Sequence, residues 1–377
     1  MTTAFWIYTD LAAFGIALLL TGIIIPQILL IAFRRKLFDE VDERKIHKGV
    51  VPRLGGIAFL PAIIFSICLV IAVSTSLGFI QTEHVFGGSV QSILYLLCAE
   101  MLIFLVGIAD DLIGVRYKAK FIAQIICAVF ICAAGAYISN LGGILWIHKI
   151  PEWLGWCISG FIVVYLVNAI NLIDGIDGLA SGLSGIALIF YGIVLTISQQ
   201  WVLALLAWAQ LGTLVPFFYY NVFGNQKKQK KIFMGDTGAL TVGVLMSFIA
   251  LSITSIDSIE ITHHYNKLVL AFSPLIIPAF DVVRVYFHRV RHHRNPFLPD
   301  KCHIHHKLLA LGLNQRASLC VILLAAVVFM LVDILLSPYI SATLLLIADI
   351  AIWITGNLLM TRAIRKKELN QHVKLYD

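Results

Sequence analysis

Charged residues are scarce in this chain. Asp, Glu, Lys and Arg make up 13% of its 377 residues, whereas a soluble domain carries about 25%. Hydrophobic residues make up 60%, and the mean hydropathy is +0.91. This composition excludes an ordinary soluble protein. A disulfide framework is also excluded, because every one of the seven cysteines except Cys302 lies inside an apolar run.

Long apolar runs, by contrast, are abundant. A helix that crosses the hydrocarbon core needs about 20 apolar residues, and we find about eleven such runs. The first run has no basic segment or cleavage site before it, so we expect a retained helix and not a signal peptide. We predict an all-α integral membrane protein in which residues 1–377 form one transmembrane catalytic domain. The predicted spans are 11–33, 54–74, 93–109, 121–138, 153–170, 179–198, 201–218, 239–253, 268–287, 318–336 and 341–359.

Basic residues are almost absent from every second connection between these spans. Of the 28 Lys and Arg residues, all but Lys149 and Lys267 fall in the odd-numbered connections and the C-terminal tail. Basic loops stay in the cytoplasm, so we predict an outside N-terminus and a cytoplasmic C-terminus. The pI near 9.0 then reflects this topology. The basic cytoplasmic face is expected to attract anionic membrane lipids, and we expect no nucleic acid as a partner. The predicted cytoplasmic segments are 34–53, 110–120, 171–178, 219–238 and 284–316, with a tail at 361–377.

Two acidic motifs lie on this predicted cytoplasmic side. Asp110 and Asp111 close the third span, and adjacent carboxylates disfavour joint ionisation unless a cation neutralises them. Mg²⁺ suits such a pair, since it binds one or two carboxylates together with substrate phosphates. A solvated helix end is the alternative. Asp236, just before the eighth span, is either a helix cap or a metal ligand that the fold brings beside Asp110 and Asp111.

The fifth connection carries a polar side chain at every third position, namely Asn168, Asn171, Asp174 and Asp177. A 3₁₀-like segment would align such positions, and the glycine after each aspartate permits irregular backbone. We predict a site for phosphate, metal or sugar here. A polar turn between spans is the alternative.

The ninth connection is dense in anion-binding groups, and a solvated basic loop is the alternative to a substrate site. Its Arg and His side chains suit phosphate and sugar hydroxyls. The cluster around Cys302 is too compact for a closed zinc site, which needs four ligands from separated pairs. Upstream, Asp281 and Arg284 have a spacing that permits an ion pair, and Pro278 is a residue type that can kink the helix. We interpret Asp281 as part of the site wall, and a purely structural ion pair is the alternative. The lysines at 227–231 are expected to be solvated surface charge.

Taken together, these motifs resemble the polyprenyl-phosphate N-acetylhexosamine-1-phosphate transferases, over about residues 47–312. The phospho-MurNAc-pentapeptide transferases (MraY) are more distant relatives, because the histidine motif at 296–306 has the form typical of the N-acetylhexosamine branch. The resemblance rests on His47-Lys48, on Pro52-Arg53-Leu54-Gly55-Gly56, on Asp110-Asp111, on residues 168–178, on Gly235-Asp236-Thr237-Gly238, and on Pro296-Phe297, Asp300 and His303-Ile304-His305-His306.

The resemblance implies an activity and a location. The expected reaction transfers N-acetylglucosamine 1-phosphate, or a related N-acetylhexosamine 1-phosphate, from a UDP-sugar to undecaprenyl phosphate and releases UMP. Mg²⁺ is the expected cofactor, with Mn²⁺ as a substitute, and the active site faces the cytoplasm from the bacterial inner membrane. Three alternative functions remain open: MurNAc-pentapeptide transfer, a polyprenyl-diphosphate pyrophosphatase and a secondary transporter. A homodimeric assembly also remains open.

Residue roles follow from the same resemblance. Asp111 and Asp236 are assigned to the metal, and Asp110 to the lipid phosphate, which it orients or deprotonates. A direct transfer and a two-step route through an aspartyl phosphate both remain open. The residues assigned to catalysis are Asp110, Asp111, Asp174 and Asp177, and those assigned to substrate binding are His47, Lys48, Asn168, Asn171, Gly175, Arg289, Arg291, His303, His305 and His306.

Overall fold

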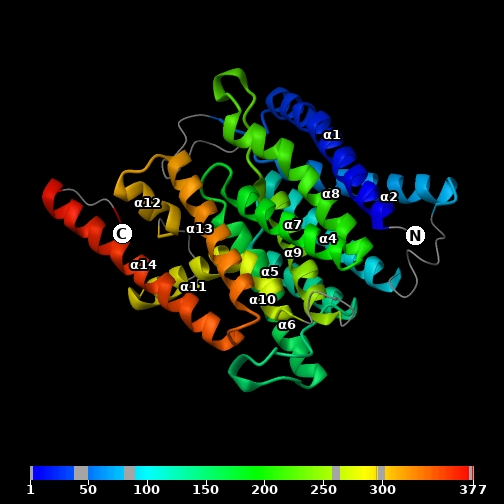
Figure 1. Cartoon of the computed structure of the whole chain (residues 1–377). Helices are drawn as coiled ribbons and strands as arrows, with labels where there is room; N and C mark the ends of the chain where they lie inside the picture. The colour runs from blue at the N-terminus through cyan, green and yellow to red at the C-terminus, as the bar shows by residue number, and fades with distance from the viewer. Residues whose placement is uncertain are drawn as a thin grey trace.

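The computed structural model describes residues 3–37, 50–79, 90–256, 264–293, 295, 302–372 and 376. Over these residues the chain is a helical bundle, and its two termini lie toward opposite ends of the view in Figure 1. The predictions for His47, Lys48 and residues 296–301 fall outside the described residues.

The helices follow the predicted apolar runs, and each of the eleven runs lies on helical structure. Within the described ranges, ten helices are long and apolar enough to cross a membrane. The remaining run forms α5, whose 17 residues span about 26 Å at 1.5 Å per residue, slightly less than the hydrocarbon core. The elements are α1 (Thr3–Arg35), η1 (Gly55–Ala58), α2 (Phe59–Ser76), α4 (Val90–Ile113), α5 (Tyr117–Ala133), η2 (Ile144–Trp146), α6 (Glu152–Ile173), α7 (Leu179–Ile197), α8 (Trp201–Phe218), η3 (Tyr219–Phe223), η4 (Gln226–Lys228), α9 (Gly235–Ser255), α10 (Lys267–Phe272), η6 (Ser273–Leu275), α11 (Ile276–Arg291), α12 (Ile304–Leu311), α13 (Gln315–Leu336) and α14 (Ala342–Gln371).

Helix α9 is the buried centre of the bundle, with its most apolar stretch enclosed along its whole length. Glycines allow its neighbours to approach closely. A Cβ added to Gly243 would lie 2.8 Å from the Cα of Val167 in α6, and one added to Gly107 in α4 would lie 2.5 Å from the Cα of Thr237. Small residues at helix contacts are typical of membrane bundles. The second contact places the start of α9 beside the end of α4.

The predicted span 268–287 is not one straight helix. It consists of α10, the 3₁₀ turn η6 and α11, with Pro274 in the turn. Pro278 lies in the first turn of α11, where backbone N–H groups have no helical partner in any case. The break therefore occurs at Pro274 and not at Pro278.

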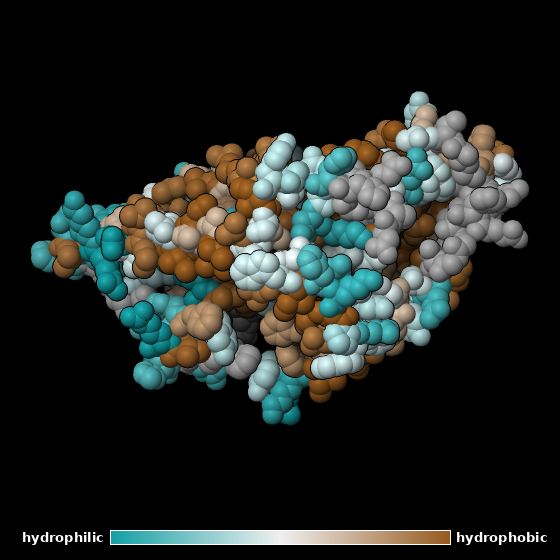
Figure 2. Space-filling model, turned by 60° about the horizontal axis from the view of Figure 1, so that its bottom comes forward, coloured by the Kyte–Doolittle hydropathy of each residue, from teal (hydrophilic) through white to brown (hydrophobic). Residues whose placement is uncertain are grey.

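The surface of the bundle is apolar over large areas. Leu19, Leu105 and Leu324 are each more than half exposed, and Figure 2 shows a broad apolar surface with hydrophilic residues gathered in clusters. A soluble monomer rarely exposes such extended apolar surface. All seven cysteines are free, as predicted.

Candidate active site

Asp111 caps the N-terminus of α9. Its Oδ1 accepts the N–H of Asp236 at 2.8 Å, and its Oδ2 accepts the N–H of Thr237 at 2.9 Å and the Thr237 hydroxyl at 2.6 Å. A carboxylate at a helix N-terminus pairs with otherwise unsatisfied N–H groups and with the helix dipole. The cap of α9 is thus Asp111, from another helix, and not Asp236 itself. Both Asp111 oxygens accept hydrogen bonds from the start of α9, and the assignment of Asp111 to the metal stays a prediction.

Lys120 joins Asp110 to Asp236. Its Nζ donates to Oδ2 of Asp110 at 3.0 Å and to Oδ2 of Asp236 at 2.8 Å. The other Asp110 oxygen accepts the N–H of Val115 at 2.7 Å, and the Asn171 side chain hydrogen-bonds to Asp236. The fold therefore brings the Asp110 and Asp236 carboxylates together, as predicted, around a lysine that sequence reasoning missed.

The signal for Lys120 was present in the sequence but ambiguous. Lys120 lies ten residues after Asp110, and Gly114, at φ +72°, turns the chain between α4 and α5. The first turn of α5 thereby returns to the end of α4. A basic residue in this connection also satisfies the topology rule, so its position alone did not distinguish a site residue from a topology signal.

The fifth connection is more helical than predicted. Helix α6 continues through Asn168 and Asn171 to Ile173, so the expected 3₁₀-like segment is wrong. Continuous α-helix satisfies the backbone groups within one segment, which the membrane favours. The Asn168 amide donates to Gln124 of α5 at 2.7 Å. This contact commits Asn168 to helix packing, whereas Asn171 reaches the site.

Irregular backbone begins at Asp174 and ends at Gly178, whose φ is +79°. Asp174 is partly buried, and this burial raises its pKa to about 7. The negative charge of Asp177 adds to this rise, and the positive charge of Arg53 opposes it. Asp177 forms an ion pair with Lys231. The expectation that Lys231 is solvated is therefore wrong, although Lys227, Lys228 and Lys230 are exposed.

Asn221 connects the same loop to the seventh connection. Its side-chain oxygen accepts the N–H of Gly178, and its amide donates to the carbonyl of Ile232 at 2.8 Å. Asn221 is buried and lies in η3, a π-helical turn. Nothing in the sequence separated it from other polar residues near span ends.

Backbone pairing brings the first connection to the same place. The N–H of Phe233 donates to Pro52 O at 2.8 Å, and the N–H of Gly55 donates to Phe233 O at 3.0 Å. A Cβ on Gly56 would lie 2.0 Å from the backbone N of Gly238, so this approach requires glycine. The pairing explains the Pro-Arg-Leu-Gly-Gly motif and places Arg53 within electrostatic range of Asp174.

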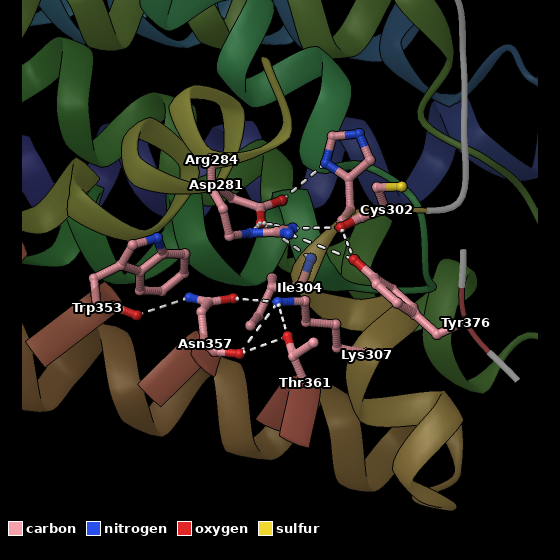
Figure 3. Close-up of polar contacts among 10 residues, drawn as sticks. Asp281, Arg284, Cys302, Ile304, Lys307, Trp353, Asn357, Thr361 and Tyr376 are labelled. Carbon is pink, nitrogen blue, oxygen red and sulfur yellow. Dashed lines mark hydrogen bonds and ion pairs between the residues drawn. The ribbon is translucent and has the colours of Figure 1, made fainter. Parts of the chain in front are cut away.

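The histidine segment is held by Asp281. His303 Nδ1 lies 2.8 Å from Asp281 Oδ2, the N–H of Ile304 donates to Oδ1 at 3.0 Å, and Arg284 donates to Oδ1 at 2.8 Å. Figure 3 shows the ion pair of Asp281 with Arg284 beside Cys302. The ion pair that the spacing of Asp281 and Arg284 permits is present.

His305 connects this segment to the aspartate loop. A Cβ on Gly175 would lie 2.3 Å from the His305 ring, so the imidazole packs directly on the Gly175 backbone. Burial lowers the pKa of His305 to about 3, which makes the ring neutral at neutral pH. Neither ring nitrogen has a hydrogen-bond partner among the described residues. His306 lies beside it, with ring centroids 4.1 Å apart.

The two arginines assigned to substrate binding lie near the end of α11. Arg291 is exposed, together with His292 and His293, whereas Arg289 is buried. The assignment of both arginines to substrate binding stays a prediction.

The residues around Asp110 and Asp236 fit Mg²⁺. They offer carboxylate and amide oxygens, and Mg²⁺ is usually held by one or two carboxylates plus waters and substrate phosphates. Within the described residues no group of three or more His, Cys, Asp or Glu could hold a metal unaided. These donor groups suit a cation that is bound together with a phosphorylated substrate.

The chain is similar in sequence to known bacterial proteins. Residues 93–254 match the family described as glycosyl transferase family 4. A relative from Yersinia pestis, named undecaprenyl-phosphate alpha-N-acetylglucosaminyl 1-phosphate transferase, is 30% identical over 312 residues, which cover 81% of this chain and 78% of the relative. The chain belongs to glycosyl transferase family 4.

Further relatives come from Escherichia coli and Bacillus subtilis. The Escherichia coli K12 protein of the same name is 30% identical over 79% of this chain and 76% of its own length. A Bacillus subtilis protein named probable undecaprenyl-phosphate N-acetylglucosaminyl 1-phosphate transferase is 29% identical over 88% of this chain and 85% of its own length. The family resemblance predicted from the motifs is confirmed, and with its apolar helices the chain is a multi-pass membrane protein.

Proposed function

We propose that the protein transfers N-acetylglucosamine 1-phosphate from UDP-N-acetylglucosamine to undecaprenyl phosphate, giving undecaprenyl-diphospho-N-acetylglucosamine and UMP. The names of its relatives support this reaction. The observation that carries it is the joining of Asp110 and Asp236 by Lys120 at one end of the bundle. Such a product starts the membrane stage of a cell-surface polysaccharide pathway.

The chemistry requires positioning more than proton removal. A phosphate monoester has a second pKa of about 6, so the lipid phosphate is already a largely ionised nucleophile at neutral pH. Its oxygen attacks the phosphorus that carries the sugar, and the bond to the UMP oxygen breaks as UMP leaves with the electron pair. Bound Mg²⁺, or Mn²⁺ in its place, would be held by Asp236 with Asp110 and would neutralise charge on the diphosphate.

The chain's own residues take distinct roles in this proposal. Asp110 orients the lipid phosphate, and Lys120 supplies positive charge to the reacting phosphates. Asp111 acts as a positioning residue through its cap on α9. Both Asp110 oxygens accept hydrogen bonds, which weakens them as nucleophiles and favours direct transfer over an aspartyl-phosphate route.

The donor sugar is proposed to lie beside the contact of the aspartate loop with the histidine segment. Asp174 and Asp177 of the loop and His303, His305 and His306 of the segment are the groups assigned to the donor. A neutral His305 can donate one hydrogen bond and accept another, which suits a sugar hydroxyl or acetamido group. The distribution of basic residues supports an outside N-terminus and a site that faces the cytoplasm from the bacterial inner membrane.

The test uses purified protein in detergent with undecaprenyl phosphate, Mg²⁺ and labelled UDP-N-acetylglucosamine. We expect label in the lipid phase and an equal amount of UMP in the aqueous phase. Asp110→Asn should abolish both signals, whereas Glu152→Gln, at the exposed far end of α6, should not.

Other outcomes identify other reactions. Label transfer only from UDP-GalNAc or UDP-MurNAc-pentapeptide would change the donor, and would make the second case an MraY-like enzyme. Phosphate release from undecaprenyl diphosphate without UMP would indicate a pyrophosphatase. No turnover of any of these substrates by folded protein would refute the transferase and favour a transporter.

A further inference from the structure

The penultimate residue, Tyr376, packs against the segment that carries the histidines. Its hydroxyl donates to the carbonyl of Cys302 at 2.7 Å and accepts from Arg284 Nη1 at 3.5 Å. The Nζ of Lys307 lies 5.7 Å from the centre of its ring. Figure 3 shows these side chains converging between α11, α12 and α14. Tyr376 thus contacts Cys302 just before the histidines and Lys307 just after them.

The Cys302 carbonyl is the point where these contacts meet. It accepts from Tyr376 and also from Arg284, the same arginine that pairs with Asp281. Asp281 in turn holds the next two residues, His303 and Ile304. A continuous hydrogen-bond network therefore runs from Tyr376 to His303.

Helix α14 supports the other side of this network. Buried Lys307 of α12 donates to the Asn357 side chain at 3.1 Å and to the Thr361 hydroxyl at 3.0 Å. The backbone N–H of Tyr376 donates to Glu368, near the end of α14, at 2.8 Å. Tyr376 is therefore fixed to α14 while it contacts Cys302. These contacts go beyond a tail that lies loosely on the surface.

We propose that Tyr376 is a positioning residue for sugar transfer, which holds the segment 302–306 so that His305 lies on Gly175. The role of the histidines in this inference rests on the proposed function. The burial of Cys302, which is 0% exposed, provides a readout that does not depend on activity. If Tyr376 is removed, the Cys302 carbonyl loses the hydrogen bond from the Tyr376 hydroxyl, and the segment around Cys302 can open.

The test compares Tyr376→Phe and Tyr376→Ala in the full-length protein with Tyr339→Phe as the matched control. Tyr339 is 85% exposed in the turn between α13 and α14. Phe keeps the ring near Lys307 and removes the hydroxyl, whereas Ala removes both. The measurements are kcat, the KM values for UDP-N-acetylglucosamine and undecaprenyl phosphate, and the rate at which N-ethylmaleimide modifies Cys302, followed by peptide mass spectrometry.

We expect Tyr376→Phe to raise the KM for the UDP-sugar about three- to tenfold, the effect of one lost hydrogen bond, with little change in the KM for the lipid. Tyr376→Ala should have a larger effect and should expose Cys302 to alkylation. Tyr339→Phe should match the wild type in every measurement.

Three results separate the possibilities. Wild-type alkylation and wild-type kinetics in Tyr376→Ala would overturn the proposal. Faster alkylation with unchanged kinetics would also overturn it, because the tail would then hold a segment that does not serve the reaction. Faster alkylation in a protein whose wild type transfers no sugar would support the docking of the tail and refute the proposed function instead.

Discussion

Replacing Lys120 with methionine removes the cation that joins Asp110 to Asp236 while keeping an unbranched side chain. Two hydrogen bonds to charged groups are lost, at 3.0 and 2.8 Å, each contributing about 1.5–3 kcal/mol. The three side chains are between 14% and 25% exposed, so solvent screening reduces the sum. We expect a loss of about 2–4 kcal/mol in stability.

The assay is thermal unfolding in detergent with and without Mg²⁺. Without Mg²⁺, Lys120→Met should unfold several degrees below the wild type, because two neighbouring carboxylates are left without a shared cation. Mg²⁺ should raise the Tm of the variant more than that of the wild type, since in the wild type it competes with Lys120 for the same oxygens. Transferase activity should fall at least about tenfold through the loss of positive charge at the phosphates.

Two control variants sharpen this experiment. Lys118→Met, an exposed position in the same turn of α5, should change neither Tm nor activity. Lys120→Arg should recover most of the Tm. Equal Tm values for Lys120→Met and the wild type without Mg²⁺, together with an equal response to Mg²⁺, would refute the reasoning.

Two further predictions concern the aspartate loop. Gly175→Ala should lower kcat/KM for the UDP-sugar at least about tenfold, because its Cβ would lie 2.3 Å from the buried His305 ring and overpacking displaces side chains. Gly15→Ala, which has open space around its Cβ, is the control. Normal turnover by Gly175→Ala would contradict the prediction. Asp174→Asn should abolish transfer yet stabilise the fold at high pH. Folding raises the pKa of the Asp174 carboxyl from 3.8 to about 7. The free energy of unfolding of the wild type therefore falls as pH increases between these values, by at most about 4 kcal/mol. The Tm advantage of the Asn variant should therefore grow from pH 5 to pH 8, and a constant difference would contradict it.

Most of the helices could be predicted because an apolar run of about 20 residues is long enough to specify a membrane helix. The break in the predicted span 268–287 was misplaced because Pro274 and Pro278 each permit one. Helix α11 starts at Ile276, so Pro278 lies inside its first turn and the break falls at Pro274. The prediction of a 3₁₀-like segment at 168–177 was wrong, because α6 continues to Ile173. The three-residue spacing described polar side chains, but the hydrogen bonds of the backbone determined the helix.

The site could be predicted only in part. The carboxylates and histidines were found because unpaired polar groups at span ends are costly, so their presence indicates function. Lys120 and Lys231 were missed because a lysine in a basic connection already has an explanation in topology. The cap from Asp111 depends on which helix approaches the end of α4, and that neighbour is set by the close contact at Gly107.

The chain itself balances part of the negative charge of the site. Lys120 pairs with both Asp110 and Asp236, Lys231 pairs with Asp177, and Asp111 is stabilised by the N-terminus of α9. These contacts hold the acidic residues together in the fold. A cation that arrives with a diphosphate would bind Asp110 and Asp236 and leave Lys120 available to the phosphate oxygens. In this arrangement Mg²⁺ is required for the reaction more than for the stability of the wild-type bundle, which is why its effect on Tm should appear chiefly when Lys120 is removed.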